Sequence, residues 1–262
     1  MNKIILCAIL GCGACLGFIG WRVHAIKNQV TPQFEIVEDF SLSHAKGCDS
    51  LDGLAERALN TEEVAQHSTV TVLVLGDQKT ADEPWQLARY SLPTDDRVLE
   101  GRAAKRRRQQ DLLADLRNKC QAVRRTTVSP IFLGVKQAVA DLRARRCSST
   151  SRCELFVDSD LEENVEASVK KRLNGPSDMK SAPVPAIDNE GIKITFCGLA
   201  ITTGLAADRG GTKRRRTSPG DASRSDRLRD VWSSLLTEPS SLEFEPYCPR
   251  PSDFQVFAPS RH

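Results

Sequence analysis

Two short apolar runs that end abruptly in polar residues constrain the fold more than any other feature. Cys153 to Asn164 reads CELFVDSDLEEN, and Val70 to Thr80 reads VTVLVLGDQKT. An unbroken apolar and β-branched run is typical of a strand buried on both faces of a parallel sheet. The break into acidic and hydroxyl residues then falls at the carboxyl end of the strand, where such sheets place their binding sites. The sequence therefore predicts a site at these two loops.

The rest of the chain alternates between strand and helix patterns. A third strand, IKITFCGL, is predicted from Ile192 to Leu199, and a closing strand at about 241–247. Helical periodicity marks about 103–123, 130–145, 164–173 and 228–236. This order predicts an α/β fold: a Rossmann-like, mainly parallel sheet with helices on both faces. Val70 to Leu75 is interpreted as the first strand, and 81–98, which contains two prolines, as a loop.

The amino terminus carries an uncharged, largely apolar run from Ile4 to Trp21. As a helix this run spans roughly 27 Å, close to the hydrocarbon thickness of a bilayer. We therefore expect a single-pass transmembrane helix or signal-anchor within 1–25. A cleaved signal peptide is the alternative, because Val23-His24-Ala25 offers small residues at cleavage positions.

The cysteines bear on the compartment. Three of the nine lie in the apolar run, which leaves Cys48, Cys120, Cys147, Cys153, Cys197 and Cys248. An even number permits full disulfide pairing outside the cytosol, and Cys147 and Cys153 flank a short polar loop as the best local pair. Cys153 and Cys197 also fit as buried thiols within strands. We expect an extracytoplasmic domain, periplasmic or extracellular.

Charge and motifs limit the function. The net charge is only +3, which argues against a dedicated nucleic-acid binder. Basic residues cluster at Lys105–Arg108 and Lys213–Arg216, either as solvated surface or as a patch for anionic lipid. No Gly-x-Ser-x-Gly elbow or phosphate-binding P-loop is present, and Cys12-x-x-Cys15 lies inside the apolar run. The four histidines lie outside the predicted sheet, so no catalytic base is assigned.

The order of these elements and loops resembles the von Willebrand factor A (vWA) family from about Thr69 to Pro249. VTVLVLGDQKT resembles the family's first strand and metal loop, Ser129-Pro130-Ile131 its second loop, and LFVDSDLEEN its third. RLRDVWSSLLTEPSSLEFEPY resembles a terminal helix and strand. The resemblance implies a linker at 26–68, a vWA-like domain at 69–249 with a flexible insertion at about 207–224, and a tail at 250–262.

In that family three loops form a metal-ion-dependent adhesion site for Mg²⁺: Asp-x-Ser-x-Ser, then Thr or Ser, then Asp. Ser129 and Asp160 match the second and third loops. The predicted first loop departs from the pattern, since one alignment keeps Thr80 and the other keeps Asp77 but places Lys79 at a hydroxyl position. The resemblance thus implies a degenerate metal site. Its candidate ligands are Asp77, Thr80, Ser129 and Asp160, and the candidate partner contacts are Asp158, Glu162, Arg106 and Arg107.

The sequence favours a membrane-tethered, vWA-like protein-binding module that is not an enzyme, with weak or lost Mg²⁺-dependent binding. One alternative is a metal-free scaffold that binds anionic lipid or a partner through the basic helix around Arg106. Another is an Asp-based phosphohydrolase, because Asp158-Ser159-Asp160 resembles the Asp-x-Asp of haloacid-dehalogenase phosphatases. Purely structural roles also remain open: Ser129 as a helix N-cap, and Asp158 and Asp160 as residues at a helix amino terminus.

Overall fold

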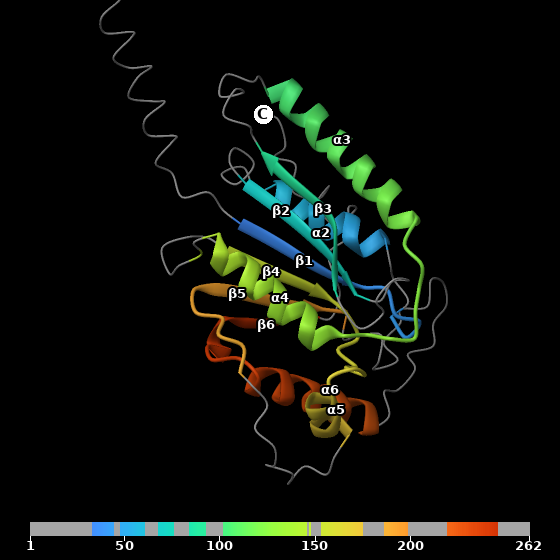
Figure 1. Ribbon diagram of the computed structural model, residues 1–262, viewed down its shortest axis with the longest axis vertical. Helices are drawn as coiled ribbons and strands as arrows, with labels where there is room; N and C mark the ends of the chain where they lie inside the picture. Colours follow the sequence, from blue (N-terminus) through green and yellow to red (C-terminus); the bar gives the residue numbers. More distant parts are fainter. Residues whose placement is uncertain are drawn as a thin grey trace, which may run out of the picture.

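A six-stranded sheet forms the centre of the protein (Figure 1). The computed structural model describes residues 33–44, 48–60, 68–75, 84–92, 102–145, 147, 153–174, 186–198 and 219–245. The strand order is β3-β2-β1-β4-β5-β6. The strands are β1 (Gln33–Asp39), β2 (Ser68–Leu75), β3 (Trp85–Leu92), β4 (Cys153–Asp158), β5 (Ile192–Cys197) and β6 (Leu242–Glu245). All pairs are parallel except β2 with β3, so the predicted mainly parallel sheet is confirmed.

The first strand is β1, and the prediction that the sheet begins at Val70 is wrong. The structure places β1 at the middle of the sheet, between β2 and β4, in a segment that we interpreted as a linker. Its sequence, QFEIVED, contains three carboxylates, all of them fully buried: Glu35, Glu38 and Asp39. Acidic residues are rarely buried, so they hide the apolar pattern by which a central strand is normally identified.

The edge strand β3 corrects a second prediction, since 81–98 was expected to be a loop. Pro84 directly precedes β3 and Pro93 directly follows it in the sequence. Both prolines therefore flank the strand, where their missing N–H groups cost no ladder hydrogen bond. The strand runs antiparallel to β2 and has a bulge opposite Val72 and Leu73, features common at sheet edges.

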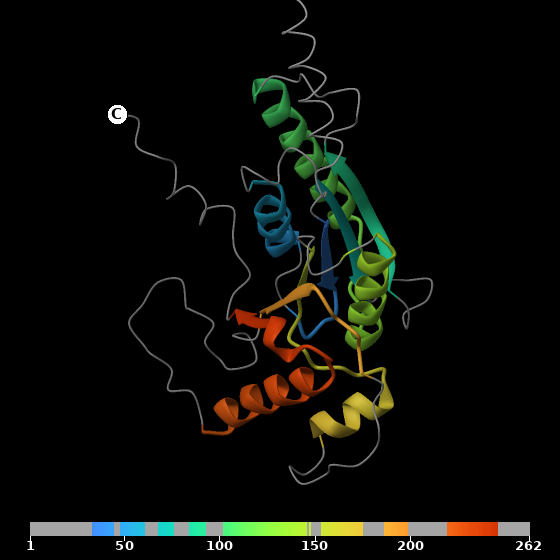
Figure 2. The same ribbon diagram turned by 90° about the vertical axis from the view of Figure 1, so that its left-hand side faces the viewer.

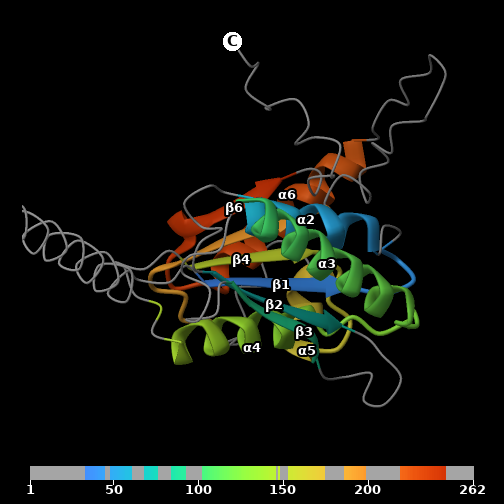
Figure 3. The ribbon, with the colours of Figure 1, turned by 90° about the horizontal axis from the view of Figure 1, so that it is seen from above.

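Helices cover both faces of the sheet, as predicted. Helices α2 (Cys48–Asn60) and α3 (Arg102–Gln121) pack on one face. Helices α4 (Ile131–Ala144), α5 (Ala167–Asn174) and α6 (Pro219–Ser234) pack on the other. Figures 2 and 3 show α2 and α4 on opposite sides of β1. Two apolar cores result, and the central strands are buried between them.

Helix α4 lies unusually close to the sheet at Gly134. A Cβ atom at this position would be 2.5 Å from Cδ2 of Leu75 and 3.2 Å from Cγ1 of Val37. A larger side chain there would require the Leu75 side chain or the helix to move. The glycine thus permits the close approach of α4, which directly follows the loop that carries Ser129.

Two disulfides join cysteines within the described residues. Cys48–Cys120 joins α2 to α3, and Cys147–Cys153 closes the short loop between α4 and β4. The predicted local pair is confirmed. Cys197 is disulfide-bonded as well. The interpretation of Cys153 and Cys197 as free thiols in strands is therefore wrong.

Within the ranges described above, no helix combines the length and the apolar character needed to span a bilayer. The predicted membrane segment at 1–25 lies outside those ranges, as do the tail at 250–262 and the basic cluster Lys213–Arg216.

Candidate metal centre

Strand β1 ends at Asp39, and an Asp-x-Ser-x-Ser sequence follows: Asp39-Phe40-Ser41-Leu42-Ser43. The Ser41 N–H donates to Asp39 Oδ1 at 2.9 Å, and the hydroxyls of Ser41 and Ser43 lie 3.0 Å apart. Asp39 and Ser41 are buried, whereas Ser43 is exposed. We call residues 39–43 the first loop. It presents one carboxylate and two hydroxyls within a few ångströms of each other.

The second loop meets the first through Ser129. Ser129 Oγ donates to Asp39 Oδ2 at 2.7 Å, in a fully buried hydrogen bond. Ser159 Oγ donates to the same carboxylate oxygen at 2.8 Å. The Ser129 hydroxyl is thus not used to cap a helix. Helix α4 has Pro130 at its N-cap position, and that position forms no side-chain capping bond.

Glu163 caps α4 instead. Its Oε2 accepts from the Phe132 N–H at 2.6 Å, and its Oε1 accepts from the N–H groups of Val165 and Glu166 at 2.7 and 2.9 Å. Burial raises the pKa of Glu163, although these three hydrogen bonds oppose the shift. The Glu163 carboxylate therefore links the third loop, which follows β4, to the first turn of α4, which directly follows the second loop.

Asp160 in the third loop completes the set. Asp160 is 2% exposed, its carboxylate accepts from the Glu162 N–H at 3.0 Å, and it accepts a hydrogen bond from the side chain of Ser43. Burial raises the pKa of Asp160, and the neighbouring Asp39 charge raises it further. A cation beside these two carboxylates would relieve both effects.

The backbone after Asp160 is strained. Leu161 adopts a φ of 62°, the left-handed region that a branched side chain rarely enters. Its side chain is fully buried, and its carbonyl accepts from Trp232 Nε1 at 3.2 Å. Packing from α6 therefore holds the third loop in a conformation that it would not adopt alone.

Asp39, Ser41, Ser43, Ser129 and Asp160 form one connected group of oxygen atoms. Carboxylates and hydroxyls are hard donors that suit Mg²⁺, which takes octahedral oxygen coordination. The group lies at the carboxyl ends of β1 and β4, between which the strand order reverses. Ligands in open α/β sheets bind at this reversal point. The residues present thus fit a Mg²⁺ site of the kind that the vWA resemblance implies.

The structure brings together two of the four predicted ligands, Ser129 and Asp160. Asp77 and Thr80 lie outside the described residues. The hydroxyls of the first loop come from Ser41 and Ser43, which we missed because β1 was not identified as a strand. The Asp-x-Ser-x-Ser pattern in the sequence was itself a sufficient signal.

The predicted partner contacts occupy varied positions. Asp158 is fully buried on β4, where Oδ1 lies 3.0 Å from His44 Nε2. Glu162 accepts from Arg224 Nε of α6 at 2.9 Å. Arg106 and Arg107 lie in the first turns of α3, and Arg107 is exposed. These turns follow the antiparallel strand β3 and therefore start at the amino ends of the parallel strands, away from Asp39 (Figure 1).

Comparisons with known proteins add little. No protein-family model matches the chain, and no curated protein matches it. Among solved structures, the pilus adhesin SpaC from Lactobacillus rhamnosus GG, in its open conformation, is 10% identical with a TM-score of 0.42, covering 83% of this chain and 28% of its own. The ArnB paralog VWA2 from Sulfolobus acidocaldarius is 10% identical with a TM-score of 0.34, covering 77% and 45%. The chain thus spans less than half of either protein, and likenesses this weak carry no conclusion here.

Proposed function

We propose that this chain is a vWA-like, non-catalytic protein-binding module that holds Mg²⁺ at its first loop and uses the ion to bind an acidic group of a protein partner. The observation that carries the proposal is the 2.7 Å hydrogen bond from Ser129 to Asp39, which joins an intact Asp-x-Ser-x-Ser loop to the second loop. The sequence implied a degenerate metal site, whereas this proposal assigns a site with a complete first loop.

The exposure of the oxygen ligands supports one particular side of the ion as the side that a partner reaches. Asp39, Ser41, Ser129 and Asp160 are buried, while Ser43 is exposed. An ion held by these oxygens has its accessible side at Ser43. Leu42, which is 61% exposed, stands beside it. A partner that supplies a carboxylate to the metal and an apolar contact to Leu42 fits this face.

The disulfides support the proposed location. Disulfides such as Cys48–Cys120 and Cys147–Cys153 are typical of oxidising compartments, such as the periplasm or the extracellular space. A single-pass helix within 1–25 would tether the domain to the membrane there. The metal centre would then face partners outside the cytosol.

Calorimetric titration of Mg²⁺ and Mn²⁺ into the chelator-treated, full-length chain tests the proposal. We expect saturable binding and a rise in Tm, both abolished by Asp160→Ala and by Ser43→Ala. Asp226→Ala, which removes an exposed carboxylate on α6, is the matched control and should bind like the wild type. Absence of binding by a folded wild type would overturn the metal-dependent function and leave a metal-free scaffold.

A further inference from the structure

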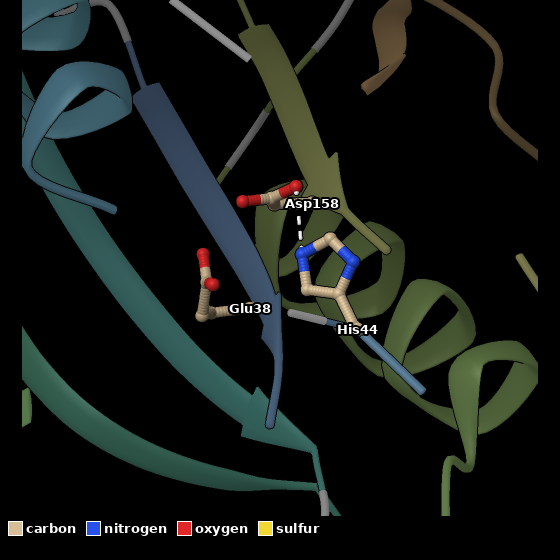
Figure 4. Close-up of side chains that lie close together, drawn as sticks. All are labelled: Glu38, His44 and Asp158. Atoms are coloured by element: carbon tan, nitrogen blue, oxygen red, sulfur yellow. Dashed lines mark ion pairs between the residues drawn. The ribbon is translucent and has the colours of Figure 1, made fainter. Parts of the chain in front are cut away.

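A second cluster of metal-ligating side chains lies directly behind the first loop. Glu38, His44 and Asp158 each offer one ligand atom, and these three atoms lie within 4.8 Å of one another (Figure 4). Glu38 and Asp158 are direct register partners on β1 and β4. His44 follows Ser43 at the end of the first loop, and its imidazole reaches back between the two strands. All three side chains are fully buried.

The cluster is rich in negative charge. His44 brings at most one positive charge to a pocket that holds the Glu38 and Asp158 carboxylates, with Asp39 and Asp160 close by. Buried charges that lack full compensation are costly, and a divalent cation is one of the ways in which proteins remove this cost.

Metal-ligating atoms without a hydrogen-bond partner also favour a bound cation in this cluster. Among the residues that the structure describes, His44 Nδ1 and Asp158 Oδ2 have no hydrogen-bond partner, although both side chains are 0% exposed. A buried polar atom without a partner costs roughly 1–3 kcal/mol. The His44–Asp158 ion pair leaves these two atoms unsatisfied, whereas a bound cation gives the imidazole and the carboxylates a common partner.

We propose that Glu38, His44 and Asp158 bind a second divalent cation, Zn²⁺, separate from the Mg²⁺ of the first loop. One imidazole nitrogen and two carboxylates form a donor set that Zn²⁺ accepts in four-coordinate geometry. Imidazole also favours first-row transition ions over Mg²⁺, which prefers oxygen donors alone. The two neighbouring sites therefore select different metals.

Gly198 indicates that the role of this ion is structural. A Cβ atom at Gly198 would lie 3.0 Å from Asp158 Oδ1 and 3.1 Å from His44 Cε1. The backbone of Gly198 thus closes one side of the cluster. The ion would fasten the His44 end of the first loop to β4 and so hold Ser41 and Ser43 in place for Mg²⁺.

The test is zinc retention by the full-length chain. Chelator-treated protein is dialysed against Zn²⁺ in the presence of excess Mg²⁺, and bound zinc is measured by elemental analysis. We expect the wild type to retain one equivalent that is lost in His44→Gln and in Glu38→Gln. Asp160→Ala should lose Mg²⁺ binding but keep this equivalent, which separates the second site from the proposed function.

Two results would overturn the proposal: a folded wild type that retains no zinc, or zinc retained unchanged in a folded His44→Gln variant. Co²⁺ bound in place of Zn²⁺ provides a test that needs no variant. Imidazole ligation in a four-coordinate site gives intense visible absorption, whereas the weak spectrum of octahedral Co²⁺ with oxygen ligands alone would also exclude the site. Loss of Mg²⁺ binding with zinc retained would refute only the proposed function.

Discussion

Ser129 and Asp39 are 90 positions apart in sequence, yet Ser129 Oγ donates to Asp39 Oδ2 across only 2.7 Å. The same oxygen accepts from Ser159 Oγ at 2.8 Å. One carboxylate oxygen therefore joins the loops that follow β1 and β4 to the loop that precedes α4. Its other oxygen accepts from the Ser41 N–H and shapes the first loop. Asp39 thus organises the site, and in the proposed function it also supplies a ligand.

Asp39→Asn should lower both stability and metal binding. The substitution removes the charge that strengthens three hydrogen bonds, and the amide nitrogen cannot accept from a serine hydroxyl. We expect a loss of about 1–3 kcal/mol in the free energy of unfolding, measured in urea, together with loss of stabilisation by Mg²⁺. Asp226→Asn serves as the control. An Asp39→Asn variant that Mg²⁺ still stabilises would contradict the assignment of Asp39 as a ligand.

Gly198→Ala should disturb the proposed zinc site formed by Glu38, His44 and Asp158. Gly198 has a φ of 104°, and an added Cβ would lie 2.9 Å from the Ser159 carbonyl oxygen. We expect about 1–3 kcal/mol of destabilisation and weaker zinc retention. Gly191→Ala is the matched control. Gly191 also has a positive φ, of 71°, but it directly precedes the first residue of β5, whereas Gly198 directly follows the last. Equal zinc retention in the two variants would show that Gly198 does not border the metal.

Glu35→Gln should change the pH dependence of stability. Burial raises the pKa of Glu35 from 4.5 to about 8, although Arg145 opposes the shift with its guanidinium 3.7 Å away. The folded state therefore holds a proton that the unfolded state releases above pH 4.5. The contribution of Glu35 to the free energy of unfolding is fully present below pH 4.5. This contribution is lost as the pH rises towards 8, by at most about 1.4 kcal/mol for each pH unit.

The Glu35→Gln variant should accordingly match the wild type at about pH 4 and exceed it in stability at about pH 8. Chemical unfolding at several pH values measures the difference. The exposed Glu190→Gln is the control and should follow the wild type throughout. A constant difference between the Glu35→Gln variant and the wild type at all pH values would contradict the raised pKa of Glu35.

The two disulfides should contribute unequally to stability. Cys48–Cys120 closes a loop with a sequence separation of 72, and Cys147–Cys153 closes one of 6. Loop-closure entropy predicts losses of about 4.4 and about 2.2 kcal/mol when each pair is replaced by serines. Thermal unfolding of the two double variants, with the reduced wild type for comparison, measures the order. The reverse order would show that packing, not chain entropy, sets the contribution of each bond.

The sequence was sufficient to predict a mainly parallel sheet with the strands β2, β4, β5 and β6, the helices on both faces and two of the site residues. Apolar runs identify β2, β4 and β5 because these strands are buried on both faces. Ser129 and Asp160 follow from the loops next to such strands. The local pair Cys147–Cys153 follows from proximity alone.

Strand β1 escaped prediction for one physical reason, although the Asp-x-Ser-x-Ser pattern at its end is visible in the sequence. Burial normally excludes carboxylates, so a strand that contains Glu35, Glu38 and Asp39 looks like a polar linker. These carboxylates lie at the middle of the sheet because they meet Arg145, His44, Ser129 and Ser159 there, on segments distant in sequence. No local pattern reports such partners. For the same reason, the sequence did not indicate His44 as a site residue. Its position beside β4 depends on the pairing of Glu38 with Asp158, which lies far away in sequence.

The position of β1 at the middle of the sheet also fixes when the protein can fold during its synthesis. Gln33 of β1 pairs with Cys153 of β4, so one side of β1 stays open until β4 has left the ribosome. At ~10 residues per second this delay is on the order of ten seconds. During that time a charged strand with an unfilled edge must be kept from pairing with other chains. A fragment that ends before β4 lacks the strand that pairs with this edge of β1, and it also lacks Asp160 of the candidate metal centre.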